Sequence, residues 1–329
     1  MKNTLAWELI ALLGPFVVAI GLPIAAFFAF DIGQAETVNS IVYFVVTIAI
    51  ALLITLKIVI HVNEKGLAAK EKPYLISDEK KRYLLFGAVL FFQNNCSINV
   101  FSIPSHVFKE DSQRSLANWW GIISHDEAVF QLSRLANANG HTPFSDIMWS
   151  EVITAGITQR WTLETLKRMV RFKEAYKVSQ RRLFDSDEDE FETLPINAQK
   201  AVEHDLLNRV NNGIKKYEEA KQMLIKELGY SQDELLKINT LAAWDFGRTA
   251  FIARESTSAG YIQEEEAWAF IKVAADNATA AYTSWREYFA AYVLGRAIAY
   301  GDTSRLLTAF DKIFGKHGFK INYSKEIKF

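Results

Sequence analysis

Two long uncharged segments stand near the start of the chain. Leu9–Phe30 is a run of 22 residues without a charge, and Thr37–Leu56 is a second run of 20. At about 1.5 Å per residue, each run can cross the roughly 30 Å hydrocarbon core of a bilayer. The alternatives are a pair of buried core helices and, for the first run, a cleavable signal peptide. Both uncharged runs are longer than the apolar segments of those structures usually are. The pattern predicts a hairpin of two transmembrane helices, about 9–30 and 37–60, within residues 1–62.

The charges beside these runs predict their orientation. The connecting loop has Asp31 and Glu36 but no Lys or Arg, whereas lysines flank the outer ends of both runs: Lys2, Lys57, Lys65, Lys70 and Lys72. Because Lys and Arg stay on the cytoplasmic side, we expect both termini to be cytoplasmic. No ionisable group lies in the middle of either run, so the hairpin is predicted to anchor the protein rather than to transport a solute.

The rest of the chain has the periodicity of helices, which predicts an all-α cytoplasmic domain. We divide it into residues 63–184, an acidic linker or insert at 185–195, and residues 196–329. Ser77 is expected to cap a helix that runs through Phe92. The residues from Asn95 to Ser105 are expected to form a loop. Ser124, with Glu127 three residues later, is expected to begin a helix that ends at Gly140.

Two further segments suggest contacts outside the domain. Leu163–Phe184 reads as one basic helix around Arg171, which could lie on anionic lipid headgroups or be neutralised by the acidic run that follows. Beyond the linker, apolar residues recur at spacings of three and four, with one polar break: Leu207, Val210, Ile214, Tyr217, Lys221, Leu224 and Leu228. This seam could pair with the basic helix or with a second copy of the chain, unless Asn211–Gly213 forms a turn.

The C-terminal part contains three predicted helices rich in aromatic and charged residues. Ser231 and Glu234 form a capping box for a helix to about Ser258; the next begins at Glu264, and the third runs from Ser284 to Gly301. We expect these helices to bring together a cluster of ligand-binding or structural residues, which comprises Trp244, Asp245, Arg248, Arg254, Tyr261, Glu266, Trp268, Tyr282, Trp285, Tyr292 and Arg296.

The same block carries three sequence motifs in order: AWDFGR at 243–248, GYIQEEEAW at 260–268 and SWREYFAAYVLGR at 284–296. Weaker matches are WWGI at 119–122, the capped helix after Ser124 and the pair Gly140–His141. With these motifs the chain resembles the bacterial domain of unknown function 1266 family. The resemblance implies a mostly helical domain in a bacterial protein, and it brings no activity with it.

Three interpretations of the cluster remain open. Asp245 could form a structural ion pair with Arg248 or Arg296, with Trp and Tyr rings stacked on the guanidinium groups. Alternatively, the arginines could line a concave site for a phosphate, a carboxylate or an acidic peptide. In the third interpretation Asp245 or Glu266 acts as a catalytic base, which would need a second group and a pocket. The sequence does not name a catalytic residue.

Composition and the missing motifs narrow the function further. Lys and Arg number 37 against 38 Asp and Glu, which speaks against a strongly basic nucleic-acid binder. Cys96 is the single cysteine and the six histidines are scattered, so we expect no metal site and no cofactor. No dinucleotide, P-loop or metalloprotease motif is present.

Taken together, the sequence predicts a protein of the bacterial inner membrane whose cytoplasmic helical module binds an unidentified partner and acts as a scaffold or regulator. A membrane-associated enzyme for a phosphate-bearing or lipid-derived substrate is the first alternative, with its site at Asp245, Arg248, Glu266 and Arg296. A homo-oligomer built on the seam is the second.

Overall fold

The computed structural model describes Val46, Ile50 and residues 75–94, 96–101, 106–156, 160–184, 194–301, 306–314 and 329. The chain divides into two compact units, Met1–Pro73 and Tyr74–Phe329. Apart from Val46 and Ile50, the predicted spans at about 9–30 and 37–60 lie outside the described residues, as does the acidic run at 185–190. Among the residues that are described, no helix has both the length and the apolar character needed to cross a bilayer.

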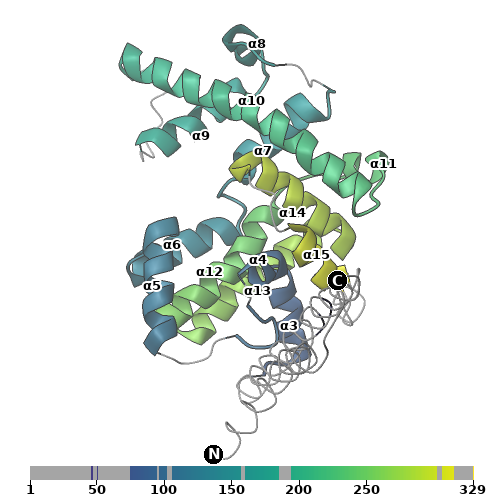
Figure 1. The fold of residues 1–329 in the computed structure, drawn as a ribbon. Coiled ribbons are helices and arrows are strands. Elements are labelled where there is room, and N and C mark those ends of the chain that lie inside the picture. Colours follow the sequence, from purple (N-terminus) through teal and green to yellow (C-terminus); the bar gives the residue numbers. More distant parts are fainter. Residues whose placement is uncertain are drawn as a thin grey trace, which may run out of the picture. The chain divides into compact units, whose positions relative to one another are not determined.

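The second unit confirms the all-α prediction, since its described residues form helices and no strand, with one isolated bridge between Leu75 and Val100. Figure 1 shows the helices packed around each other. Their bounds are α3 Asp78–Leu85, α4 Ala88–Gln93, α5 His106–Trp120, α6 His125–Ala136, α7 Thr142–Met148, the π-helix η2 Trp149–Ile153, α8 Leu163–Lys167, α9 Phe172–Phe184, α10 Ile196–Lys226, α11 Gln232–Leu236, α12 Ala243–Ala259, α13 Glu264–Ala281, α14 Trp285–Tyr300 and α15 Leu306–Phe314.

Several predicted helix ends are confirmed by their capping bonds. The hydroxyl groups of Ser77, Ser124, Ser231 and Ser284 each accept a bond from a main-chain N–H in the first turn of α3, α6, α11 and α14. Gly301, with φ +81°, ends α14 in the left-handed conformation. The end of α6 was predicted too late, because the helix stops at Ala136 and not at Gly140.

The helix predicted from Ser77 through Phe92 is in fact two helices, α3 and α4, separated at Phe86–Gly87. The reason is a close approach to α12. A Cβ atom at Gly87 would lie 2.8 Å from the Cβ of Ala250 and 3.1 Å from the carbonyl oxygen of Gly247. The chain therefore turns where its main chain touches another helix, a contact that the local pattern does not reveal.

The helix predicted from Ser231 to Ser258 is also two helices, α11 and α12. The Asp146 carboxylate of α7 accepts a 2.7 Å bond from the Leu241 N–H and another from the Thr240 hydroxyl. The Leu241 N–H and the Thr240 hydroxyl therefore have an acceptor although neither residue is part of a helix. A residue almost a hundred positions earlier thus fixes the turn before α12.

The basic segment predicted as one helix is divided into α8 and α9, with Met169 buried in the turn between them. Its charges are partly balanced by α10. The ammonium group of Lys167 lies 2.6 Å from the Glu203 carboxylate, and the guanidinium of Arg182 lies 3.1 Å from the Asp205 carboxylate. The pairing of this segment with the helix that follows 185–195 is therefore the arrangement observed.

The seam lies on α10, which runs unbroken through Asn211–Gly213. A Cβ at Gly213 would have only ordinary to slightly tight contacts, with Met148 and Ile298. The seam residues Val210, Ile214, Tyr217 and Leu224 are buried, and α10 packs against α9 and α14. This face is covered within the chain.

Helix α12 is central to the unit and packs against α4, α5, α6, α13 and α14. All residues from Ala243 to Ala253 are buried, including polar ones. An α-helix that is buried on every side needs partners for each of its polar side chains. Two of its charged residues, Asp245 and Arg248, lie within this buried stretch and therefore mark the candidate site.

Candidate functional site

Asp245 and Arg248 form a buried ion pair on α12. They are spaced three residues apart, which places them on neighbouring positions of the helix surface, and Nη2 of Arg248 donates to Oδ1 of Asp245. Asp245 is fully buried and Arg248 is 4% exposed. Of the two pairings that the sequence left open for Asp245, the structure contains the one with Arg248.

The Asp245 carboxylate also holds the turn between α6 and α7. It accepts main-chain N–H bonds from Gly140 at 2.9 Å, His141 at 3.0 Å and Thr142 at 3.1 Å, and a 2.7 Å bond from the Thr142 hydroxyl. A Cβ at Gly140 would lie 2.7 Å from Oδ1 of Asp245, so only glycine fits here. Both carboxylate oxygens are thus occupied by donors.

These contacts set the ionisation of the pair. Burial raises the pKa of Asp245, but the charge of Arg248 and the bonds from His141 and Thr142 outweigh it and leave the pKa below its usual value. Burial, and then the charge of Arg248, lower the pKa of His141 to about 3. At neutral pH Asp245 is therefore an anion, Arg248 a cation and His141 a neutral imidazole.

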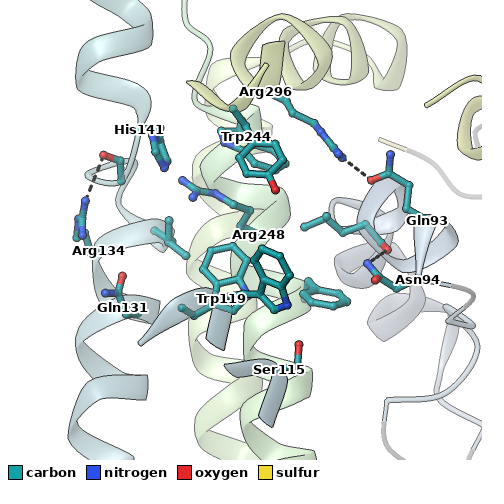
Figure 2. Close-up of a pocket in the computed structure, with 16 residues that line it drawn as sticks. Gln93, Asn94, Ser115, Trp119, Gln131, Arg134, His141, Trp244, Arg248 and Arg296 are labelled. Atoms are coloured by element: carbon teal, nitrogen blue, oxygen red, sulfur yellow. Dashed lines mark hydrogen bonds between the residues drawn. The ribbon is translucent and has the colours of Figure 1, made fainter. Parts of the chain in front are cut away.

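Arg248 faces a cavity of about 660 Å³, shown in Figure 2. We call it the arginine–tryptophan cavity. Its walls come from α4, α5, α6, the α6–α7 turn, α12 and α14. The lining residues are Leu90, Gln93, Asn94, Ser115, Trp119, Trp120, Gln131, Arg134, Leu135, Gly140, His141, Trp244, Arg248, Phe251, Arg296 and Tyr300.

The arginines of the cavity lie against aromatic rings. The guanidinium carbon of Arg248 is 4.9 Å from the ring centre of Trp244 and 5.6 Å from that of Trp120. Arg296 lies 5.4 Å from the Trp244 ring, and its Nη1 donates to Oε1 of Gln93. Such cation–π contacts keep a guanidinium charged and oriented in a partly dry place.

The third arginine comes from α6. Arg134 donates from Nε to the carbonyl of Asn139 at 2.9 Å, and from Nη2 to that of Gly140 at 3.4 Å. Figure 2 shows it on the same wall as Gln131 and His141. Its recorded partners are uncharged carbonyls, so no carboxylate among the described residues neutralises its charge.

The described lining residues contain three arginines and neither Asp nor Glu. Asp245 balances Arg248 from behind the wall, and no described carboxylate pairs with Arg134, so the charge of Arg134 is left in excess among the described lining residues. Two buried donors beside the cavity, Nε of Arg248 and Nε1 of Trp244, have no acceptor among the described residues. Their dipoles add to the positive potential, so the cavity favours an anion that brings its own acceptor oxygens.

The structure brings part of the predicted cluster to this cavity. Trp244, Arg248 and Arg296 line it, and Asp245 lies behind Arg248. Tyr292 is fully buried with its ring centre 5.2 Å from that of Trp244, where burial raises the pKa of its hydroxyl. Tyr292 therefore supports the wall without lining the cavity.

The other predicted residues do not line the cavity and make contacts elsewhere. Arg254 donates to the carbonyl of Ser97 at 2.6 Å, and Glu266 lies 3.2 Å from Nε2 of His125 on α6. Trp268 packs on Phe101, and three more residues pack into the core or against it, away from the cavity: Tyr261, Tyr282 and Trp285. The grouping of Glu266 with Asp245 and Arg296, which the enzyme alternative assumed, is not observed.

Several lining residues were absent from the predicted cluster. Trp119 and Trp120 belong to the weak WWGI motif, and His141 belongs to the pair with Gly140, but these motifs by themselves do not indicate a place in the site. Arg134 and Tyr300 had no local signal. Only the packing of α6 and α14 onto α12 brings them to the cavity.

The fold and this cavity define an all-helical domain with a positively charged, ligand-sized hollow, and the described residues contain no cluster of metal-ligating side chains. Residues 115–313 match the family model described as Protein of unknown function (DUF1266). The chain belongs to this family. Neither a curated protein nor a solved structure matches it. The matched residues include every wall of the cavity except α4 with the adjoining Asn94.

Proposed function

We propose that this protein is a membrane-anchored cytoplasmic module that binds a small anionic molecule, bearing a phosphate or carboxylate, in the arginine–tryptophan cavity. The observation that carries the proposal is the charge of the walls, with three arginines and no acidic residue among the described lining. A volume of about 660 Å³ falls within the roughly 300–1,000 Å³ typical of small-molecule sites.

The state of Asp245 favours binding over catalysis. A general base must reach the proton that it removes, yet Asp245 is fully buried and its two oxygens accept bonds from Arg248, Thr142 and the main chain of 140–142. Glu266, the other predicted base, is not part of the cavity lining. We therefore assign Asp245 the task of orienting Arg248.

The membrane part of the proposal rests on the sequence alone. The uncharged runs Leu9–Phe30 and Thr37–Leu56 would form the hairpin, and the lysines that flank it would keep the helical module in the cytoplasm. We do not extend the proposal to lipid contact by the basic segment around Arg171, because Lys167 and Arg182 already pair with carboxylates of α10.

The test is calorimetric titration of the full chain, in an uncharged detergent, with pyrophosphate and with citrate. We expect at least one of them to bind, and Arg134→Gln to weaken binding about tenfold or more, since a hydrogen bond to a charged group contributes about 1.5–3 kcal/mol. Arg114→Gln is the matched control: Arg114 is exposed on α5 and does not line the cavity. Absence of binding, or equal loss in both variants, would contradict the proposal.

A further inference from the structure

We infer that the anion is a nucleotide, with its base stacked on Trp119 and its phosphate at the arginines. This inference rests on the proposed function and adds to it the class of ligand. It starts from Trp119, which lines the cavity although the residue is 74% exposed. Figure 2 shows Trp119 below Arg248.

An exposed indole beside a cationic cavity offers a flat stacking surface. Trp119 has no ring partner within the described part of the domain, whereas Trp120 next to it lies under the guanidinium of Arg248. Every nucleobase has a π-face that stacks on tryptophan, and this stacking changes affinity by about 5- to 150-fold per base. An aliphatic anion such as citrate would leave this surface unused.

The uncharged polar groups of the lining suit the edge of a base. Asn94, Ser115 and Gln131 line the cavity and are uncharged, and each can both donate and accept hydrogen bonds. Figure 2 places Gln131 on one side of the cavity and Asn94 on the other. Neutral groups of this kind read the mixed donors and acceptors of a nucleobase, which an inorganic anion lacks.

The arginines of the cavity are placed so that they could bind the phosphate group of a nucleotide. Arg134 comes from α6 and Arg296 from α14, so cations stand on separate elements around one hollow. A phosphate monoester carries up to two charges and three terminal oxygens, and it can be shared by more than one guanidinium. The cavity thus combines an aromatic surface for the face of a base, uncharged polar groups for its edge, and arginines for a phosphate.

The experiment compares matched probes by calorimetry on the full chain in uncharged detergent. Ribose 5-phosphate lacks the base of a nucleoside monophosphate, and adenosine lacks the phosphate of AMP. The nucleotide panel is the 5′-mono-, di- and triphosphates of the four common ribonucleosides. We expect at least one nucleotide to bind ten times or more as tightly as ribose 5-phosphate and as its own nucleoside.

Two variants test whether the base stacks on Trp119. Trp119→Ala should weaken nucleotide binding at least fivefold and leave the affinity for pyrophosphate or ribose 5-phosphate within twofold. Phe130→Ala is the control, because Phe130 is 59% exposed on α6 and does not line the cavity. Equal loss of nucleotide and pyrophosphate in Trp119→Ala would overturn the stacking assignment.

The outcomes also separate this inference from the proposed function. If pyrophosphate, citrate or ribose 5-phosphate binds and no nucleotide binds more tightly, the nucleotide inference fails and the anion-binding function stands. If none of the probes binds, both fail. The thermal midpoint of each variant, compared with the wild type, shows that the protein is folded when a loss of binding is recorded.

Discussion

At the scale of single residues, Asp245 links the core to the cavity. Its carboxylate holds the turn at 140–142 and also orients the guanidinium of Arg248 toward the cavity. Removing one partner of a buried ion pair is costly, because it leaves an uncompensated charge in a dry place. The residue that shapes the site is thus also one on which the fold depends.

We therefore expect Asp245→Asn to lower the free energy of unfolding by about 3–5 kcal/mol. For a domain of this size that corresponds to a fall of about 6–20 °C in the thermal midpoint. Asp276→Asn is the matched control, because Asp276 forms an exposed pair with Lys272, and such pairs contribute about 1 kcal/mol or less. Differential scanning calorimetry of the full chain in detergent measures both. An unchanged midpoint for Asp245→Asn would show that Asp245 is not needed for stability.

At the scale of elements, the crossing of α12 with α4 and α14 decides how close the cavity walls stand. Gly247 of α12 lies at this crossing. A Cβ there would come within 2.5 Å of the Tyr292 ring and 2.9 Å of the Phe86 carbonyl oxygen. The carbonyl belongs to the main chain and cannot turn aside, so the crossing requires glycine.

Gly247→Ala should therefore destabilise the protein by about 1–3 kcal/mol, as overpacking of a core does. Gly213→Ala on α10 makes the same change in another helix, where the nearest atom is the flexible methyl end of Met148 at 3.3 Å. There we expect a gain of up to about 1 kcal/mol, because alanine favours helix over glycine. Urea unfolding of the two variants measures the difference. Two losses of equal size would refute the close crossing.

At the scale of the whole molecule, the proposal places a ligand-binding domain at the inner face of a membrane. The flanking lysines predict that the C-terminus is cytoplasmic. A fluorescent protein fused after Phe329 should fluoresce in bacterial cells, and alkaline phosphatase fused there should be inactive, since it matures only outside the cytoplasm. Fusions after Gln34, in the connecting loop, should give the reverse. The opposite pattern would invert the orientation.

Much of the secondary structure could be predicted from local patterns. Capping residues such as Ser124 and Ser284 act within their own first turn, and the acidic residues at the start of α13 act on the nearest helix end. Their effects are short-ranged and therefore readable in sequence. The family motifs likewise indicated where the charged and aromatic residues of α12 and α14 stand.

The breaks at Gly87 and before α12 could not be predicted in this way. They arise from contacts with Ala250 and Asp146, residues distant in sequence. The cavity is a further example: Arg134 and Trp119 join Arg248 because α5 and α6 pack on α12. Such contacts leave no periodic trace along the chain.

The sequence by itself determined the helical class, the family, the uncharged runs near the start and the capping of several helices, because these depend on residues close together in the chain. Only the tertiary structure decided that Asp245 is enclosed by donors from 140–142, that Glu266 belongs elsewhere, and that Arg134, Arg248 and Arg296 surround one hollow. Enclosure depends on which surfaces meet, and that is set by packing between distant elements.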